Sequence, residues 1–448
     1  MHGSNSLSPA PDQNSGTVAV VGLGKIGLPL AVQYVRQGRT VIGCDINAQI
    51  VAGINAGQCH VHEEPGLEDE VATAVAGGKL RAETDTTHAT RQADVIVVIV
   101  PVVVTPDHQP DFRAIDAATR AVGEGLESGK LVIYETTLPV GTTAGRLRRL
   151  LEEASGLVAG RDFLLAYSPE RVSSGHIFRD LATYPKVVGG IDEASTEAVI
   201  AFYRSVLDAQ VIRMPSTNDA EFVKLIETTY RDVNIALANE YAQFADARGL
   251  DVGAAIAAAN TQPYSHIHTP GVGVGGHCIP VYPYFLMDSA DTGLALPRAS
   301  RIINDSMATY AAERIEAVLG SLSGQGVLIL GIAYRKNVRE TAFSTARLLQ
   351  AALVARGACV YVHDPLYTAE EIEAMGYTAL RESSYPQIRA MIVQADHQEY
   401  ETFDFSQFHH CELLFDGRQA FSPERFEALG MRYLRIGGGE KMLSPAGS

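Results

Sequence analysis

The chain has 448 residues, 46% of them hydrophobic, and is long enough for two or three domains with cores of their own. Lys and Arg number 36 against 52 Asp and Glu, and the net charge of −16 argues against nucleic acid or an anionic membrane as the main partner. The five cysteines lie far apart without a Cys-x-x-Cys pair, so neither disulfides nor a metal site is indicated, and a cytoplasmic location is expected.

Residues 1–16 are polar and rich in Ser, Pro and Asn, and they lack the basic start and apolar core of a signal peptide. We interpret them as a disordered tail. No stretch approaches the roughly 18 uninterrupted apolar residues that a membrane-spanning helix requires. We therefore expect no membrane partner.

From Thr17 onward, short apolar runs alternate with longer helical segments. Near-continuous Val and Ile in such runs indicates strands buried on both faces, as in a parallel sheet covered by helices. The predicted strands lie at 17–22, 40–45, 94–101 and 131–136. They predict a doubly wound, Rossmann-like domain over residues 17–215.

One long helix is predicted over 219–248, a stretch without Gly or Pro in which apolar residues recur at spacings of three and four. A helix of about 30 residues spans roughly 45 Å. It is expected to link two domains and to pack either in the core or against a second copy, and we predict a homodimer through it. Its apolar positions are Phe222, Leu225, Ile226, Val233, Leu237, Tyr241 and Phe244.

The strand pattern restarts after about residue 320, with predicted strands at 326–334, 358–365, 389–395 and 412–418. A second parallel-sheet domain is therefore predicted over 319–448, after a central region at 216–318. The expected fold class is α/β, with two doubly wound Rossmann-like parallel-sheet domains joined by a long central helix.

The sequence Gly22-Leu-Gly-Lys-Ile-Gly27 directly follows the first predicted strand, and Asp45 ends the next one. The three glycines permit a tight turn, close approach of the pyrophosphate, and packing of helix on strand. The pyrophosphate then lies at a helix N-terminus. Asp45 would bind both ribose hydroxyls and repel a 2′-phosphate, which favours NAD over NADP. The predicted cofactor-binding residues here are Gly22, Gly24, Lys25, Ile26, Gly27 and Asp45.

Cys278 lies in the glycine-rich run from Gly271 to Pro280, GVGVGGHCIP, where four glycines allow close backbone approach and prolines fix the turn. A thiol in such a loop is a candidate nucleophile, against the alternative of an inert small residue. His277 either helps to ionise the thiol or has a structural role, and the structural role is favoured. The remaining thiols are expected to be inert and buried: Cys44, Cys59, Cys359 and Cys411.

These motifs together resemble the UDP-glucose/GDP-mannose dehydrogenase family over residues 17–438. The resemblance rests on the fingerprint with Asp45 and on segments in the family's order: ETTLPVGT (135–142), SPER (168–171), AEFVK (220–224), GGHCIP (275–280) and FDGR (415–418).

The resemblance implies oxidation of the C6 hydroxymethyl of a nucleotide sugar to a carboxylate, with two NAD and no metal. Cys278 matches the nucleophile that forms a thiohemiacetal and then a thioester. Lys224 matches the lysine that stabilises the oxyanion. Glu170 matches the carboxylate assigned to the hydrolytic water. Thr137 matches a threonine that positions substrate or water at the cofactor.

The resemblance also implies a set of contacts to the UDP-sugar: Glu170, Arg171, Val172, Lys224, Arg231, Asn234, Gly275 and Arg418. Simpler interpretations remain open for several of these residues. Lys224 is alternatively a solvated helix lysine, and Thr137 a cap at a strand end. Glu170 is alternatively a carboxylate of a surface turn, and Arg418 a residue that closes a turn.

The chain departs from the family pattern at several polar positions: Tyr282 replaces an aspartate, Ser174 a glutamate, Thr228 an asparagine, and Tyr264 and Ala342 arginines. The water-ordering duty of the missing aspartate is therefore in question.

The segments SPERV (168–172) and GGHCIP resemble the branch that acts on UDP-N-acetylhexosamines more than the UDP-glucose branch. UDP-N-acetylmannosamine or UDP-N-acetylglucosamine is the expected substrate, and UDP-glucose is the alternative. Two further hypotheses are a dehydrogenase that stops after one oxidation and a non-catalytic paralogue that only binds nucleotide sugars. Counting the NADH formed per sugar separates these hypotheses. Complete oxidation to the acid predicts two, a single oxidation predicts one, and a protein that only binds predicts none.

Overall fold

The computed structural model describes residues 16–172, 175–290 and 293–439, and the chain divides into two compact units. Within the described ranges, the first unit comprises 16–227 and 284–290, and the second 228–283 and 293–439. The boundary falls inside α9 (Thr217–Arg248), the helix predicted over 219–248. Of the predicted tail, only Gly16 lies within the described residues.

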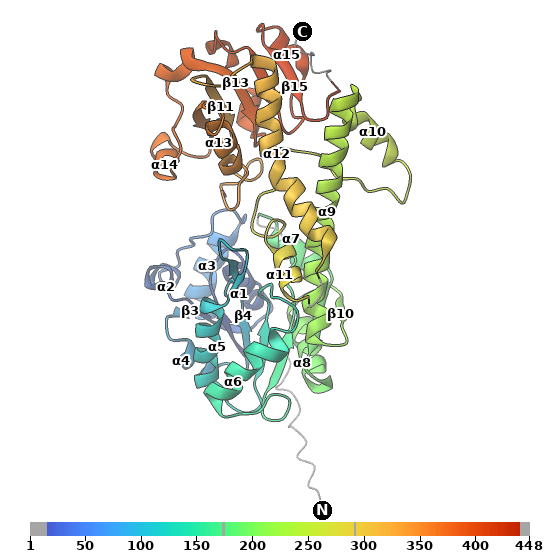
Figure 1. Ribbon diagram of the computed structural model, residues 1–448. Coiled ribbons are helices and arrows are strands. Elements are labelled where there is room, and N and C mark those ends of the chain that lie inside the picture. The colour runs from blue at the N-terminus through green and yellow to red at the C-terminus, as the bar shows by residue number, and fades with distance from the viewer. Residues whose placement is uncertain (1–15, 173–174, 291–292, 440–448) are drawn as a thin grey trace, which may run out of the picture. The chain divides into compact units, whose positions relative to one another are not determined.

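The first unit is built on an eight-stranded sheet in the order β10-β9-β8-β7-β4-β1-β2-β3 (Figure 1). The first six strands in chain order have the 3-2-1-4-5-6 arrangement of a dinucleotide-binding fold, with the order reversing between β1 and β4. Its strands are β1 (Thr17–Val21), β2 (Thr40–Cys44), β3 (Leu80–Glu83), β4 (Val95–Val98), β7 (Leu131–Tyr134), β8 (Leu164–Tyr167), β9 (Lys186–Gly190) and β10 (Val211–Arg213). A separate small hairpin pairs β5 (Val103–Val104) with β6 (Pro110–Asp111).

One pairing of this sheet differs from the predicted parallel pattern, because β9 runs antiparallel to β8. The added pair of β9 and β10 is itself parallel. β9 reads KVVGG and β10 reads VIR, so neither shows the long apolar run from which β1, β2, β4 and β7 were predicted.

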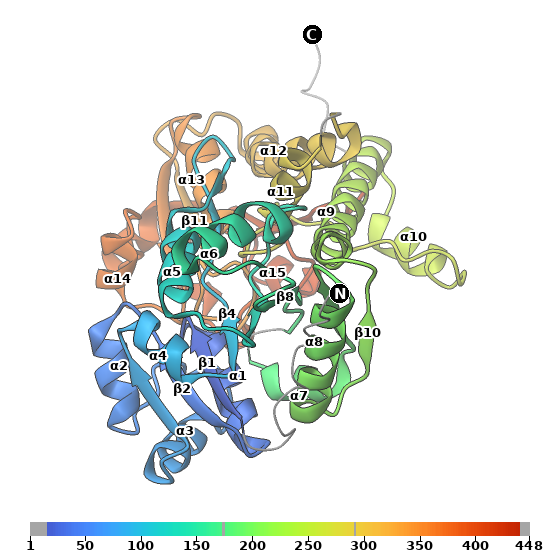
Figure 2. The same cartoon turned by 90° about the horizontal axis from the view of Figure 1, so that it is seen from below.

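Helices cover this sheet in two groups. α5 packs against α4 and α6, and Figure 2 shows α5 and α6 side by side, whereas α1 packs against α3 and α7. The helices of the first unit are α1 (Gly27–Arg36), α2 (Ala48–Asn55), α3 (Leu67–Ala76), α4 (Thr86–Gln92), α5 (Arg113–Gly125), the π-helical turn η1 (Thr143–Leu147), α6 (Arg148–Ser155), α7 (Ile177–Thr183) and α8 (Glu193–Val206).

The second unit contains an all-parallel sheet in the order β12-β11-β13-β14-β15, which reverses between β11 and β13. This 2-1-3-4-5 order is the other common doubly wound arrangement. The predicted α/β class with doubly wound parallel sheets is therefore confirmed, although the two sheets differ in strand order. The strands are β11 (Gly326–Leu330), β12 (Cys359–His363), β13 (Ile388–Val393), β14 (Leu413–Asp416) and β15 (Arg432–Arg435).

The second unit's helices include α10 (Val252–Ala259), α12 (Ala295–Leu319), α13 (Ala346–Val354), α14 (Ala369–Ala374) and α15 (Pro423–Glu427), and α11 (Tyr282–Asp288) begins in this unit. Three short 3₁₀ turns are η2 (Glu382–Gln387), η3 (Gln398–Glu401) and η4 (Phe405–Gln407). α12 packs against α13 and β14, so it closes one face of the second sheet. In the described parts of the chain, no helix is both long and apolar enough to cross a membrane.

Candidate active site

The predicted dinucleotide turn joins β1 to α1. Gly22 has a φ of 97°, a conformation that favours glycine. A Cβ at Gly27 would lie 1.9 Å from the carbonyl oxygen of Gly22, so only glycine permits this contact of helix and strand. A Cβ at Gly24 would meet no heavy atom within 4 Å, which leaves room for a ligand beside the backbone. α1 begins at Gly27 and has no side-chain hydrogen bond at its N-cap, Ile26.

Asp45 follows β2 and lies beside this turn. Its Oδ2 accepts a hydrogen bond from the Leu23 N–H at 3.0 Å, and its Oδ1 accepts one from the Asn47 N–H at 2.9 Å. A carboxylate offers about four lone-pair positions, so roughly two remain for hydroxyl donors. The open space at Gly24, the uncapped N–H groups of α1 and the oriented Asp45 carboxylate fit NAD. Lys25, also predicted here, forms an ion pair of 2.8 Å with Glu63.

Thr137 lies just beyond the carboxyl end of β7 and is buried. Its neighbour Thr136 donates a hydrogen bond of 2.8 Å to the Val100 carbonyl oxygen, which connects the ends of β7 and β4. Thr137 therefore lies at the carboxyl edge of the first sheet, next to β4, which is one of the two strands between which the order reverses. This is the usual ligand-binding edge of such sheets.

Glu170 belongs to a buried group of charges that the sequence did not reveal. The ammonium of Lys186, at the start of β9, lies 2.9 Å from Glu170 Oε2 and 2.8 Å from Glu135 Oε2. The hydroxyls of Tyr34 and Tyr203 donate to Glu135 Oε1 at 3.1 and 2.5 Å. Glu135 was part of the motif ETTLPVGT without a role of its own, and the sequence held no signal for Lys186 beyond a lysine that precedes two valines.

The two carboxyls of this group differ in acidity. Burial and the charge of Glu170, opposed by Lys186, raise the pKa of Glu135 to about 7. Burial alone would raise the pKa of Glu170, but Lys186, a hydrogen bond with Glu135 and the Arg171 N–H lower it to about 2. Near neutral pH, Glu170 is thus an anion paired with Lys186, and Glu135 is poised between its two forms.

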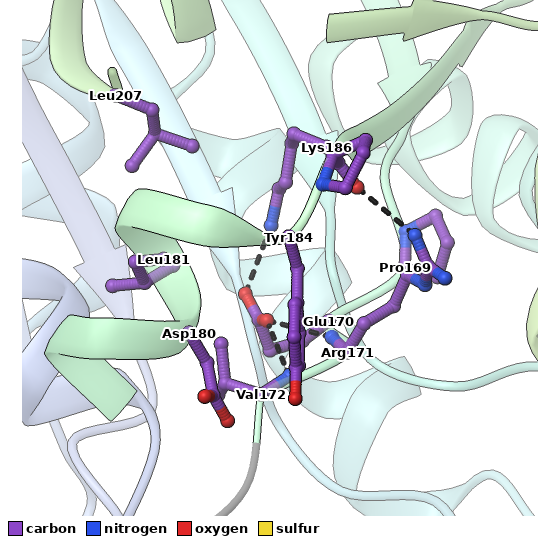
Figure 3. A pocket seen from close by; sticks show the side chains of 10 residues that line it. Pro169, Glu170, Arg171, Val172, Asp180, Leu181, Tyr184, Lys186 and Leu207 are labelled. Atoms are coloured by element: carbon purple, nitrogen blue, oxygen red, sulfur yellow. Dashed lines mark hydrogen bonds and ion pairs between the residues drawn. The ribbon is translucent and has the colours of Figure 1, made fainter. Parts of the chain in front are cut away.

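Glu170 and its neighbours line a pocket of the first unit (Figure 3). Glu170 Oε1 accepts hydrogen bonds from the N–H groups of Arg171 and Val172 at 2.6 and 3.0 Å. The Arg171 guanidinium lies 2.7 Å from Glu227 and also donates to the Pro185 carbonyl oxygen. The structure thus brings three predicted substrate residues together, while Ser174 lies outside the described residues.

Lys224 lies on α9 in the first unit and is buried, with a relative exposure of 9%, unlike the solvated lysine of the alternative interpretation. Thr228 is buried one helical turn further along. Arg231 is exposed on the same helix. Asn234 holds a loop, since its amide donates to the His266 carbonyl oxygen at 2.5 Å and accepts from the His268 N–H at 2.9 Å.

Cys278 lies in the second unit as a half-buried free thiol. Its loop is fixed at several points. The Gly271 N–H donates to Asn239 Oδ1, and the Gly276 N–H donates to the Ala342 carbonyl oxygen, at 2.9 and 2.8 Å. A Cβ at Gly275 would lie 2.8 Å from Tyr334 Cβ, so this glycine permits close packing. The loop therefore presents its thiol from a backbone with little freedom.

A buried polar network continues from this loop into the helices of the second unit. Asn239 on α9 donates to Asn304 Oδ1 at 2.9 Å, and Asn304 on α12 donates to Asp232 Oδ1 at 2.8 Å. Arg301 completes the network with an ion pair of 2.6 Å to Asp232. None of these four residues was assigned a role from the sequence, because their contacts join segments far apart in the chain.

The residues next to Cys278 have other contacts. His277 is largely exposed, and its Nε2 lies 3.3 Å from Glu340 Oε2. The N–H of Tyr282 donates to the Cys278 carbonyl oxygen at 2.9 Å, which starts α11. Tyr264 is 89% exposed and follows α10. The burial expected of the other cysteines holds for Cys44, Cys59 and Cys411, but was wrong for Cys359, which is exposed at the start of the edge strand β12.

Arg418 follows β14 at the carboxyl edge of the second sheet. Its Nε donates to the Gln394 carbonyl oxygen at 2.5 Å, beyond the end of β13. A Cβ at Gly271 would lie 3.0 Å from its Nη1, so the start of the cysteine loop lies against this guanidinium. The adjoining turn is closed by Asp416, whose carboxylate accepts from the N–H groups of Arg418 and Ala420.

Comparison with known proteins identifies the class. Models of the UDP-glucose/GDP-mannose dehydrogenase family match three parts of the chain: its NAD binding domain residues 16–207, its central domain residues 218–306, and its UDP binding domain residues 328–423. The chain belongs to this family and is an NAD-dependent nucleotide-sugar dehydrogenase.

The chain is similar to relatives over nearly its whole length. A UDP-N-acetyl-D-mannosamine dehydrogenase of Pyrococcus horikoshii is 35% identical over 90% of this chain and 95% of its own. An NDP-N-acetyl-D-galactosaminuronic acid dehydrogenase of Ralstonia nicotianae is 33% identical over 94% and 100%. Among solved structures, the UDP-D-ManNAc dehydrogenase of P. horikoshii is 33% identical with a TM-score of 0.85, covering 95% of this chain and 100% of that one. A UDP-glucose dehydrogenase of Pyrobaculum islandicum is 28% identical with a TM-score of 0.84, covering 96% and 100%.

Proposed function

We propose that this protein oxidises the C6 hydroxymethyl of UDP-N-acetyl-D-mannosamine to the uronic acid in two successive oxidations. The observation that carries the covalent route is the setting of Cys278, a half-buried free thiol on a loop held at Gly271 and Gly276. The glycine turn and Asp45 hold NAD, which serves as the electron acceptor of both oxidations, so two NAD are consumed per sugar.

The thiolate of Cys278 attacks the carbonyl carbon of the aldehyde that the first oxidation produces. A C–S bond forms, and the oxygen takes up a proton to give a thiohemiacetal. The second oxidation gives a thioester, and water displaces the sulfur, which releases the acid and restores the thiol. Lys224 stabilises the negatively charged oxygen of these steps, Glu170 accepts the proton of the attacking water, and Thr137 positions the reacting groups.

The substrate assignment is supported by the similar proteins, several of which are UDP-N-acetyl-D-mannosamine dehydrogenases. The Ralstonia relatives support a second candidate, an N-acetylgalactosamine-type nucleotide sugar. UDP-N-acetylglucosamine and UDP-glucose remain competitors. In this proposal six residues contact the UDP-sugar besides Glu170 and Lys224: Arg171, Val172, Arg231, Asn234, Gly275 and Arg418.

We propose further that two copies of the chain pair through α9. Six large apolar residues on this helix are between 40% and 61% exposed, and their spacing places them within about 100° of its circumference. They are Phe222, Ile226, Tyr230, Leu237, Tyr241 and Phe244.

The five free thiols support a reducing, cytoplasmic location.

The test of the activity is a comparison of nucleotide sugars with NAD as acceptor. The full chain is incubated with UDP-N-acetyl-D-mannosamine, its glucosamine and galactosamine counterparts, UDP-glucose and GDP-mannose. We expect two NADH per sugar, a uronic acid by mass spectrometry, and the highest kcat/KM with the mannosamine. One NADH per sugar would indicate a dehydrogenase that stops at the aldehyde, and none would indicate a binding protein.

A further inference from the structure

Lys186 is a fully enclosed cation at the edge of the Glu170 pocket. Its side chain is 5% exposed, between Glu135 at 0% and Glu170 at 11%. Figure 3 shows the ammonium pointing at the Glu170 carboxylate from the start of β9. Since β9 lies next to β8 in the sheet, the lysine reaches a carboxylate that follows the carboxyl end of β8.

The hydrogen bonds around Glu170 leave it little freedom. Oε1 accepts from two backbone N–H groups, those of Arg171 and Val172, and Oε2 accepts from Lys186. Three of about four lone-pair positions are therefore occupied by donors on the protein. Lys186 is the charged side chain among these donors and acts together with the hydrogen bond from Glu135, so the direction of the second oxygen depends on it.

Glu135 holds the lysine from the other side. Its Oε1 is already engaged by the hydroxyls of Tyr34 on α1 and Tyr203 on α8, and its Oε2 faces Lys186. The Lys186 ammonium also lies 4.9 Å from the centre of the Tyr203 ring. The lysine is thus held by a carboxylate that follows β7, by a carboxylate that follows β8, and by the Tyr203 ring on α8.

We propose that Lys186 is a positioning residue for Glu170, and that Glu135 is the second carboxyl that keeps Lys186 in place. This inference rests on the proposed function, in which Glu170 accepts the proton of the water that hydrolyses the thioester. A buried ion pair contributes little net stability compared with well-packed apolar residues, because desolvation offsets the attraction. The consequence that remains is the fixed direction of the Glu170 carboxylate.

The inference is tested by Lys186→Met and Lys186→Arg in the full chain, beside Glu170→Gln. The matched control is Lys130→Met, which removes another buried lysine of the first unit. Lys130 is 10% exposed and donates to the carbonyl oxygens of Thr90 and Arg91 at 2.7 and 2.6 Å. Each variant is assayed for kcat, for the KM of both substrates, for the thermal midpoint, and for a covalent adduct on Cys278 by intact-mass spectrometry.

We expect Lys186→Met to lower kcat for acid formation roughly 10²-fold, the loss typical of a displaced catalytic group. The adduct on Cys278 should accumulate during turnover, while the KM for NAD stays unchanged. The kcat of Lys186→Arg should lie between those of wild type and Lys186→Met, because arginine keeps the positive charge but has a side chain of different length and shape. Lys130→Met should lower the thermal midpoint and leave kcat per folded molecule unchanged.

Two results would overturn the inference: wild-type hydrolysis in Lys186→Met, or a loss that only follows the folded fraction, as in the Lys130→Met control. Should Lys186→Met not fold, Lys186→Arg decides, and wild-type hydrolysis in it also overturns the inference. Failure of the proposed function is read separately, because wild-type acid formation by Glu170→Gln removes Glu170 from the reaction whatever Lys186 does.

Discussion

Asp45 is the residue on which we expect the choice between NAD and NADP to depend. Its carboxylate is held by the N–H groups of Leu23 and Asn47 at the end of β2. We expect Asp45→Ala to lower kcat/KM for NAD about tenfold or more, since one hydrogen bond to a charged group is worth about 1.5 to 3 kcal/mol. Discrimination against NADP should weaken at the same time, because the repulsion of a 2′-phosphate is lost.

The measurement is kcat/KM with both cofactors at one sugar concentration. Asp192→Ala is the matched control. Asp192 also follows a strand, β9, and caps α8 through the Ser195 N–H. Because β9 runs antiparallel to β8, Asp192 lies at the edge of the sheet opposite to Asp45. An Asp45→Ala variant with wild-type constants for both cofactors would place this carboxylate away from the ribose.

Cys278 is the residue on which the proposed covalent route depends. We expect Cys278→Ala to form no uronic acid and to bind NAD as wild type does, because the thiol lies outside the first unit that carries the glycine turn. Calorimetric titration with NAD and product analysis by mass spectrometry measure the two effects. Cys359→Ala is the control, an exposed thiol of the same unit that should leave acid formation intact. Complete conversion of the nucleotide sugar to the uronic acid by Cys278→Ala would rule out the thioester intermediate.

Residues of the site were predictable where the chemistry is local in sequence. The glycine turn, Asp45 and the loop of Cys278 each lie within one short segment whose backbone demands are visible in the residue types. The Lys186 cluster was missed for the opposite reason. Lys186 follows Glu135 by 51 residues and meets it only through the strand order of the sheet.

Among the elements, α9 was predicted almost to its ends because its apolar period is sustained over eight turns without a helix breaker. Strands with long Val and Ile runs were equally visible. β3 (LRAE) and β10 (VIR) were missed, since edge strands are half-exposed and carry charges that break the apolar run. β9 was missed because its sequence has only two valines between a lysine and two glycines, and the burial of that lysine beside Glu135 and Glu170 cannot be seen in the sequence.

The exposed apolar stripe of α9 makes a prediction about this element. A charge introduced at the stripe should weaken the pairing of two copies, because an unpaired carboxylate would be buried in the interface. We expect Tyr241→Asp with Phe244→Asp to change a wild-type dimer into a monomer in analytical ultracentrifugation. Tyr264→Asp, an exposed aromatic outside α9, is the control and should leave the mass unchanged. A monomeric wild-type chain would contradict the proposed pairing.

At the scale of the whole molecule, stability should depend on pH through buried carboxyls. Burial and Glu170 raise the pKa of Glu135 to about 7, and burial raises that of Glu221 to about 7. An unfolded glutamate has a pKa of about 4.3. Between about pH 4.3 and 7, the folded chain therefore binds protons at these two sites that the unfolded chain has lost, and the free energy of unfolding falls as pH rises. Glu170, with its pKa lowered to about 2, acts in the opposite direction and loses its contribution as pH falls from about 4.3 toward 2.

Glu135→Gln isolates one part of this dependence, because glutamine keeps the size and an acceptor oxygen for Lys186 but does not ionise. We expect the decline in the free energy of unfolding between pH 5 and 8 to be smaller in Glu135→Gln by on the order of 2 kcal/mol, since one unit of pKa shift is worth about 1.4 kcal/mol. Urea denaturation at four pH values measures it, with the exposed Glu68→Gln on α3 as the control that should keep the wild-type profile. The decline that remains in Glu135→Gln is expected from Glu221, whose carboxylate accepts from the N–H groups of Gly141 and Thr143. If Glu135→Gln follows the wild-type curve at every pH, Glu135 holds no extra proton in the folded chain, and the low pKa of Glu170 then has to come from Lys186 and the backbone N–H groups alone.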